Sequence, residues 1–164
     1  MNESDRSPAS ACTTPNSAAD PGNTRPAPTA GSAIIPCLRY RDAVAAIDWL
    51  CAAFGFQRHA VYLDGDIVRH AQLTYGGGMV MLGSATRDSE WGRLVAQPAD
   101  TGLRVTQGAC VVVRDVDAHY ARAVATGASI VQDIADQGYG GRGYSCRDPE
   151  GHLWWFGSYD PWTD

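Results

Sequence analysis

Residues 147–157 read RDPEGHLWWFG, and this stretch decides how the second half of the chain folds. Its tetrapeptide DPEG has the signature of a type I turn, with proline at the second position and glycine at the fourth. The apolar residues after the turn predict a strand over His152–Gly157, and Tyr144–Arg147 is predicted to be the strand that pairs with it.

The residues before this hairpin predict a helix between two further strands. Ala109–Val113 is the first strand, and Asp115 is a good N-cap for a helix that ends at Gly127. Ser129–Ile134 is the strand that follows the helix. The second half of the chain therefore has the predicted order β-α-β-β-β.

The first half of the chain predicts the same order of elements. Asp42 caps a helix with one apolar face, and Gly55 ends it. Two of the strands that follow form a hairpin, because the Asp-Gly pair at 64–65 is a strong turn signal. The four predicted strands are Ile34–Tyr40, Phe56–Leu63, Ile67–Tyr75 and Met79–Leu82.

The two halves also share residues at a fixed spacing. The dipeptide Arg-Asp at 41–42 recurs 73 residues later at 114–115, and the same spacing separates Cys37 from Cys110. Agreement at several positions within one predicted order of elements indicates a duplicated module.

The composition divides the chain into a tail and one domain. Residues 1–32 contain no large apolar side chain apart from Met1, so we expect a disordered N-terminal tail. The folded domain is predicted over 33–162. Its first module spans 33–82 and its second spans 108–157, with a polar linker over 83–107.

Composition and charge exclude several classes of protein. No apolar run reaches the roughly 20 residues that a membrane span needs, and the N-terminus lacks the apolar core of a secretory signal. All 13 basic residues are arginine and are scattered through a chain of net charge −5, which argues against nucleic-acid binding. Five cysteines without a Cys-x-x-Cys pair favour reduced thiols in the cytoplasm.

Three stretches of the sequence resemble one known family. They are LRYRD at 38–42, RDPEGH at 147–152 and the glycine-rich segment that begins at Tyr139. Together with the paired modules they resemble the vicinal oxygen chelate superfamily, which contains lactoylglutathione lyase, extradiol dioxygenases and bleomycin-resistance proteins. The resemblance covers about Ala33 to Pro161. It implies an α+β fold in which two βαβββ modules form a curled mixed sheet around a cavity, with helices outside.

The resemblance also raises the question of a metal. Enzymes of this superfamily hold a divalent ion with side chains on the first and last strands of each module. Alignment to that pattern selects Ile35, Leu82, Gly108 and Trp155. None of these side chains offers a lone pair to a metal. The sequence therefore predicts no metal site, no cofactor and no catalytic residue.

Because the predicted cavity has no metal ligands, we interpret the chain as a protein that binds a small molecule. We expect a cytoplasmic protein that binds an aromatic or amphipathic small molecule, with antibiotics among the candidate ligands. The resemblance further implies a homodimer. The candidate ligand-binding residues are Cys37, Arg39, His70, Gln72, Leu82, Cys110, Tyr139, Arg142 and Trp155. The alternatives are a metal-dependent lyase, isomerase or dioxygenase whose ligands the alignment misses, and a module that only binds a partner.

Several of these residues have a second interpretation. Trp155 is either a stacking platform for a planar ligand or a plug that fills the place of a metal. Arg39 either holds a ligand carboxylate or forms a surface salt bridge, and His70 is either a ligand contact or a structural histidine. Cys37 and Cys110 are interpreted as small buried hydrophobic residues, with a redox or soft-metal pair as the alternative.

The segment GYGGRG at 138–143 matches a dinucleotide-binding motif only formally. That motif requires a strand before it and a helix after it, whereas a strand and the DPEG turn follow here. We therefore predict a loop over the mouth of the cavity, from which Tyr139 and Arg142 contact the ligand.

Overall fold

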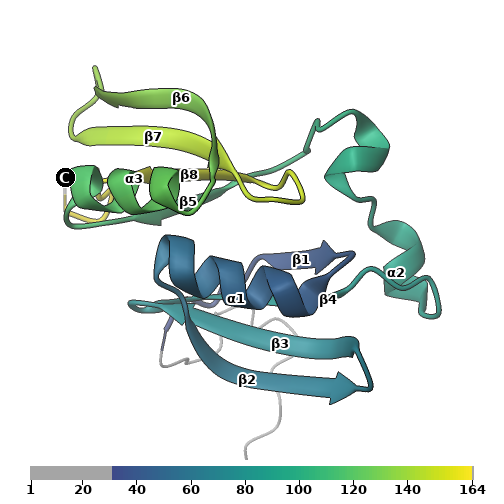
Figure 1. Cartoon of the computed structure of the whole chain (residues 1–164). Helices are drawn as coiled ribbons and strands as arrows, with labels where there is room; N and C mark the ends of the chain where they lie inside the picture. Colours follow the sequence, from purple (N-terminus) through teal and green to yellow (C-terminus); the bar gives the residue numbers. More distant parts are fainter. Residues whose placement is uncertain (1–30, 164) are drawn as a thin grey trace, which may run out of the picture.

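The computed structural model describes residues 31–163, so the predicted tail lies almost wholly outside the described residues. The first four-stranded sheet has the strand order β1-β4-β3-β2, and the second has the order β5-β8-β7-β6 (Figure 1). The first sheet contains β1 (Cys37–Tyr40), β2 (Gln57–Asp64), β3 (Ile67–Tyr75) and β4 (Gly78–Ser84). The second contains β5 (Ala109–Val112), β6 (Ser129–Asp136), β7 (Arg142–Arg147) and β8 (Leu153–Gly157).

Both sheets have the same internal pairing. The first strand of each module pairs in parallel with the last, and the other pairs are antiparallel. This arrangement confirms the predicted α+β class and the repeated β-α-β-β-β order. The two sheets are separate and are not closed.

One helix of each module begins at an aspartate cap, as predicted. In α1 (Ala43–Phe54) the Asp42 carboxylate accepts a hydrogen bond of 2.9 Å from a backbone N–H of the first turn. Gly55 ends α1 in the left-handed conformation with φ 81°. Asp115 caps α3 (Val116–Ala125) in the same way. No helix among the described residues is long and apolar enough to cross a membrane.

The linker contains two short helices that the sequence did not predict. These are α2 (Glu90–Leu94) and the 3₁₀ helix η1 (Pro98–Thr101). The linker runs along one side of the molecule from the first module to the second (Figure 1). Helices of five and four residues are too short to show the apolar periodicity that predicts a helix.

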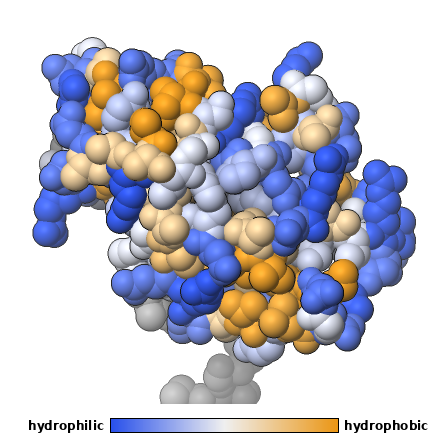
Figure 2. Space-filling view, in the orientation of Figure 1, coloured by the Kyte–Doolittle hydropathy of each residue, from blue (hydrophilic) through white to orange (hydrophobic). Residues whose placement is uncertain are grey.

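Apolar side chains also reach the surface. Trp91 and Leu94 of α2 are exposed, as are Val44 of α1 and Val124 of α3. Figure 2 shows that the apolar surface on this side of the molecule is divided by polar residues into separate patches. Exposed apolar residues that are scattered in this way are normal for a folded protein.

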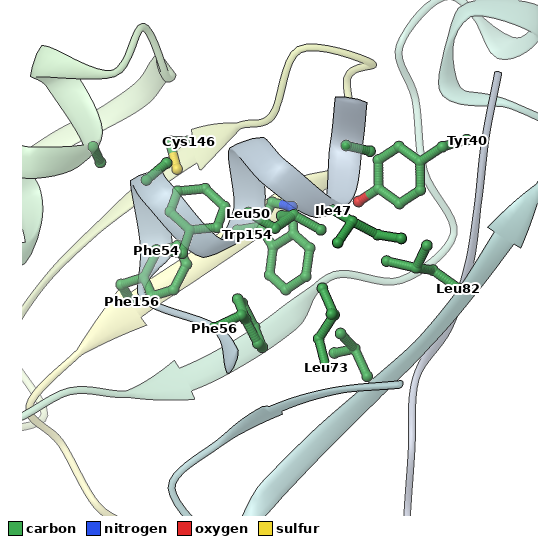
Figure 3. Close-up of a cluster of buried hydrophobic side chains, with 14 of the residues drawn as sticks. Tyr40, Ile47, Leu50, Phe54, Phe56, Leu73, Leu82, Cys146, Trp154 and Phe156 are labelled. Atoms are coloured by element: carbon green, nitrogen blue, oxygen red, sulfur yellow. The ribbon is translucent and has the colours of Figure 1, made fainter. Parts of the chain in front are cut away.

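The two modules share one hydrophobic core. Phe54, the last residue of α1, and Phe56, just before β2, meet Trp154 and Phe156 of β8 in the second module (Figure 3). The ring centroids of Phe54 and Phe156 are 4.5 Å apart, and those of Phe56 and Trp154 are 5.6 Å apart. Because all four side chains are at most 5% exposed, neither module can separate without uncovering this cluster.

A buried carboxylate of the DPEG turn also joins the modules. Asp148 Oδ2 accepts hydrogen bonds from the Tyr40 hydroxyl at 2.7 Å and from the Trp154 indole N–H at 3.0 Å. Its Oδ1 accepts from the backbone N–H groups of Glu150 and His152. Each oxygen of the carboxylate therefore accepts two hydrogen bonds, which compensates for its removal from water. Burial and the neighbouring carboxylate raise the pKa of Tyr40.

The next acid of the turn holds the start of α1. The Glu150 carboxylate accepts from the backbone N–H of Arg41 at 2.7 Å and of Asp42 at 2.8 Å. His152 Nε2 lies 2.9 Å from the carbonyl oxygen of Arg39 and donates to it, since a carbonyl only accepts. The turn of the second module is thus docked on the β1–α1 junction of the first.

His119 of α3 is a third polar link inside the core. Its Nε2 is 3.1 Å from the Phe54 carbonyl oxygen, and its Nδ1 is 2.7 Å from the Tyr144 hydroxyl. The carbonyl requires the proton on Nε2, so in the neutral ring Nδ1 accepts from the tyrosine hydroxyl. Burial lowers the pKa of His119 to about 4.

The Asp148 contacts predict a specific loss of stability. We expect Tyr40→Phe to lower the free energy of unfolding by about 1.5–3 kcal/mol, because one hydrogen bond to a buried charge is lost. We expect Asp148→Ala to cost about 3–5 kcal/mol, because several buried donors lose their acceptor. Urea denaturation measures both. Tyr62→Phe, at an exposed hydroxyl, is the control and should change little; an equal loss for Tyr40→Phe and Tyr62→Phe would contradict the assignment.

The His119 contacts predict a pH dependence of stability. The unfolded histidine takes up a proton below its ordinary pKa of about 6.5, whereas the folded one stays neutral down to about pH 4. The free energy of unfolding should therefore fall by up to about 3 kcal/mol as the pH drops through that window. Denaturation measured from pH 7 to pH 4 tests this. His119→Gln should flatten the pH profile, and the exposed His59→Gln should not.

Candidate functional site

Strand alternation gives each sheet a face that packs on the helices and an open face. In the second sheet, Trp154 and Phe156 point into the core, whereas Trp155 between them is only partly buried. Cys110 and Ser145 pair with Trp155 across the sheet and so share its face. This row crosses the middle of the open face of the second sheet.

The Trp155 indole lies over two glycines. Gly143 of β7 and Gly157 of β8 are paired with each other on the same face. A Cβ at Gly143 would lie 2.7 Å from Cζ2 of the indole, and a Cβ at Gly157 would overlap the six-membered ring. The ring therefore rests against the sheet where only glycine leaves room for it. No other aromatic ring among residues 31–163 stacks on it.

Polar and apolar groups surround this ring. The Ser145 hydroxyl donates a hydrogen bond of 2.7 Å to Oε1 of Gln132, which lies on the neighbouring strand β6. Cys110 and Val112 of β5 are exposed on the same face. The open face of the second sheet thus combines a large aromatic surface with a polar row beside it.

The open face of the first sheet is built differently. Cys37, Met81 and Gln72 form its central row, at positions paired across β1, β4 and β3. The Gln72 amide nitrogen lies 3.1 Å from His70 Nε2, and the ring of Tyr62 stacks on His70 with centroids 6.1 Å apart. The first sheet therefore carries a thiol, a thioether and polar side chains at the positions where the second sheet carries the Trp155 indole.

Arg39 lies at the end of this face nearest the linker. Its guanidinium donates a hydrogen bond of 3.2 Å to the Ser84 carbonyl oxygen. A Cβ at Gly83 would lie 2.7 Å from the same guanidinium, so the arginine side chain crosses β4 over a glycine. No carboxylate pairs with Arg39 among the described residues, and the predicted salt bridge is absent from them.

Leu82 does not join the other predicted residues. It is 3% exposed and packs in the core, on the helix side of the first sheet (Figure 3). The open face instead carries Met81, which pairs with Cys37 as Trp155 pairs with Cys110. Cys37 and Cys110 are 73 residues apart, but their partners Met81 and Trp155 are 74 residues apart. The extra residue turns the side chains of β4 to the faces opposite to those predicted.

Tyr139 and Arg142 also lie apart from the open-face rows. Tyr139 is exposed in the loop before β7, and its ring packs edge-on against Tyr159. Arg142 forms ion pairs with Asp117 of α3 at 3.1 Å and with Asp136 at 3.0 Å. The structure therefore places the Arg142 guanidinium beside α3 and not with Trp155.

The interpretation of Cys37 and Cys110 as buried hydrophobic residues is wrong for this chain. Both thiols are exposed, whereas Cys146 is fully buried and its pKa is raised to about 12 by burial. The reason is orientation, since Cys37 and Cys110 point to the open faces and Cys146 points to the core.

The open-face positions of β1, β4, β5 and β8 carry no imidazole or carboxylate. The open-face positions on the first and last strands are Cys37, Met81, Cys110 and Trp155. They supply two thiols, a thioether and an indole in place of imidazoles and carboxylates. Among the described residues, no group of three or more His, Cys, Asp or Glu is arranged to hold a metal.

Sequence reasoning found Trp155 but missed what supports it. The signal is the pair of glycines Gly143 and Gly157 at alternate positions in apolar strands, where glycine often marks a close approach of another group. It also missed Gln132, because a polar residue in the predicted strand β6 carries no distinctive pattern.

Comparison with known proteins gives one family. A family model described as the Glyoxalase/Bleomycin resistance protein/Dioxygenase superfamily matches residues 33–156. An uncharacterized protein of Mycobacterium tuberculosis (strain ATCC 25618 / H37Rv) is 35% identical over 131 residues, covering 76% of this chain and 73% of that protein. An uncharacterized protein of Mycobacterium bovis is also 35% identical over 131 residues, covering 76% of this chain and 82% of that protein.

Solved structures show the same fold. The crystal structure of TioX from Micromonospora sp. ML1 superposes with a TM-score of 0.61 at 37% identity, covering 76% of this chain and 93% of TioX. The fosfomycin resistance protein FosX from Mesorhizobium loti superposes with a TM-score of 0.54, covering 79% of this chain and 93% of FosX. At 14% identity, FosX shows a shared fold only.

Proposed function

The chain belongs to the Glyoxalase/Bleomycin resistance protein/Dioxygenase superfamily, and we propose that it binds a small planar aromatic molecule on the open face of its second sheet. The observation that carries the proposal is the Trp155 indole resting on Gly143 and Gly157. One face of the ring is supported by the sheet, and the other is left for a ligand.

A supported indole is well suited to stacking. Tryptophan presents a large flat surface, and its position over the sheet limits the conformational freedom that binding would otherwise remove. Offset stacking of two aromatic rings contributes about 0.5–1.5 kcal/mol beyond the burial of their area. Both effects favour a fused-ring ligand over a flexible aliphatic one.

The groups beside Trp155 favour a ligand with one polar edge. Gln132 Oε1 is occupied by the Ser145 hydroxyl, so the amide keeps its N–H donors for a ligand carbonyl or ring nitrogen. The neighbouring Cys110 and Val112 extend the apolar surface. This combination supports an aromatic or amphipathic ligand, with antibiotics among the candidates.

We propose binding without metal catalysis. The support is the donor set, because β1, β4, β5 and β8, the strands on which the resemblance expects metal ligands, carry no histidine, aspartate or glutamate. A cytoplasmic location stays a prediction from the sequence.

We also propose that two copies of the chain associate. Val112 of the second sheet is 43% exposed and Tyr62 of the first is 60% exposed, both on the open faces. A second copy that covers these faces would bury this apolar surface and turn each open face into an enclosed site.

Titration with the planar dye proflavine tests whether the Trp155 indole on Gly143 and Gly157, which we call the aromatic platform, binds a ligand. Calorimetry should show saturable binding to the wild type, and Trp155→Ala should weaken it at least about tenfold, as expected for the loss of a central aromatic contact. Gly157→Ala should also weaken binding, because the new methyl group displaces the indole.

Trp162→Ala is the matched control, because Trp162 is 93% exposed outside both sheets. If neither Trp155→Ala nor Trp162→Ala changed the affinity for proflavine, ligand binding on the aromatic platform would be refuted. The same titration with Mn²⁺, Ni²⁺ and Zn²⁺ examines the enzyme alternative, which stoichiometric and chelator-sensitive binding would support.

Sedimentation velocity tests the association of two copies. The wild type should sediment as a dimer, and Val112→Asp should shift it towards the monomer because a charge is buried at the interface. Val44→Asp is the control, since this exposed valine lies in the first turn of α1 on the helix side. A wild type that sediments as a monomer at all concentrations would contradict the proposal.

A further inference from the structure

Two adjoining cavities lie beside the linker, away from Trp155. Their volumes are about 240 and 320 Å³, and Arg41 and Gln97 line both of them. We call the two together the linker crevice. Its walls come from the end of β1, from residues 85–87 after β4, from the linker helices and from the DPEG turn (Figure 1).

The smaller cavity has an excess of positive charge. Arg39, Arg41 and Arg87 line it, and Asp100 is its only carboxylate. The Arg41 guanidinium is 3.1 Å from Asp100, which neutralises one of the three cations. The Arg87 guanidinium has no hydrogen-bond or ion-pair partner among the described residues. Two uncompensated guanidinium groups thus face one small space in a protein whose net charge is −5.

The acids of the larger cavity do not cancel this charge. Asp148 and Glu150 line it, but their oxygens already accept the hydrogen bonds that join the two modules. Arg147 lines the same cavity, and within residues 31–163 its guanidinium donates only to the Gly151 carbonyl oxygen, at 2.8 Å. The crevice as a whole therefore favours an anion.

Gln97 supplies an independent observation. It is 7% exposed, and its Oε1 is buried without any hydrogen-bond partner. Leaving a buried carbonyl oxygen unpaired costs about 1–3 kcal/mol, so such a group calls for a donor. Gln97 lines both cavities, so rotation of its amide would bring Oε1 to a donor bound in either one.

We propose that the linker crevice binds a small organic anion that also carries a hydroxyl or amine donor. The anionic group, a phosphate or a carboxylate, would pair with Arg87 and Arg39, since guanidinium groups bind both in a bidentate manner. The donor would satisfy Gln97 Oε1. This site is separate from the aromatic platform, because it lies by the linker and uses none of the residues around Trp155.

Calorimetric titration of the full chain at low salt tests the crevice, with glycerol 3-phosphate and L-malate as probes. Both carry a hydroxyl, and they separate a phosphate from a carboxylate ligand. We expect at least one of them to bind saturably, one molecule per chain. Arg87→Gln should weaken that binding at least about tenfold, because a charge-assisted hydrogen bond is lost.

Arg104→Gln is the matched control, because this exposed linker arginine lines neither cavity. It should keep the wild-type affinity, and so should Trp155→Ala. Gln97→Leu should weaken binding of the hydroxylated probe and leave the affinity for inorganic phosphate or acetate unchanged. Absence of saturable binding for both probes, or equal weakening by Arg87→Gln and Arg104→Gln, would overturn the proposal. Thermal denaturation confirms that each variant is folded.

Discussion

The rest of the structure depends on one buried carboxylate. Asp148 accepts the Tyr40 hydroxyl from one module and the Trp154 indole N–H from the other, while Glu150 of the same turn holds the start of α1. These contacts fix the second sheet relative to the first and commit one face of each sheet to the shared core. The opposite face of each sheet stays uncovered and forms the open face described above.

Strand alternation then decides which side chains are available to a ligand. Trp154 and Trp155 are adjacent and chemically identical, yet one is a core residue that donates to Asp148 and the other is a partly exposed ring over glycines. The same alternation brings Cys37, Met81 and Gln72 to the surface of the first sheet. The two modules have thus kept one fold while their open faces carry different chemistry.

Much of the fold could be predicted from the sequence because its signals are local: aspartate caps, the Asp-Gly turn and the DPEG turn. The orientation of β4 could not, because Met81 and Leu82 are both apolar and only pairing with β1 shows which one faces the core. The linker crevice was also beyond prediction, since Arg41 is far in the sequence from Arg87 and Gln97 and meets them only where the linker packs beside the end of β1.

The most direct test of this account is a crystal structure of the protein with proflavine. The account predicts the dye stacked on Trp155, with its ring atoms about 3.5–4.0 Å from the indole, and Gly143 and Gly157 beneath the indole. A dye bound only elsewhere, or an indole turned away from the two glycines in the unliganded crystal, would contradict it.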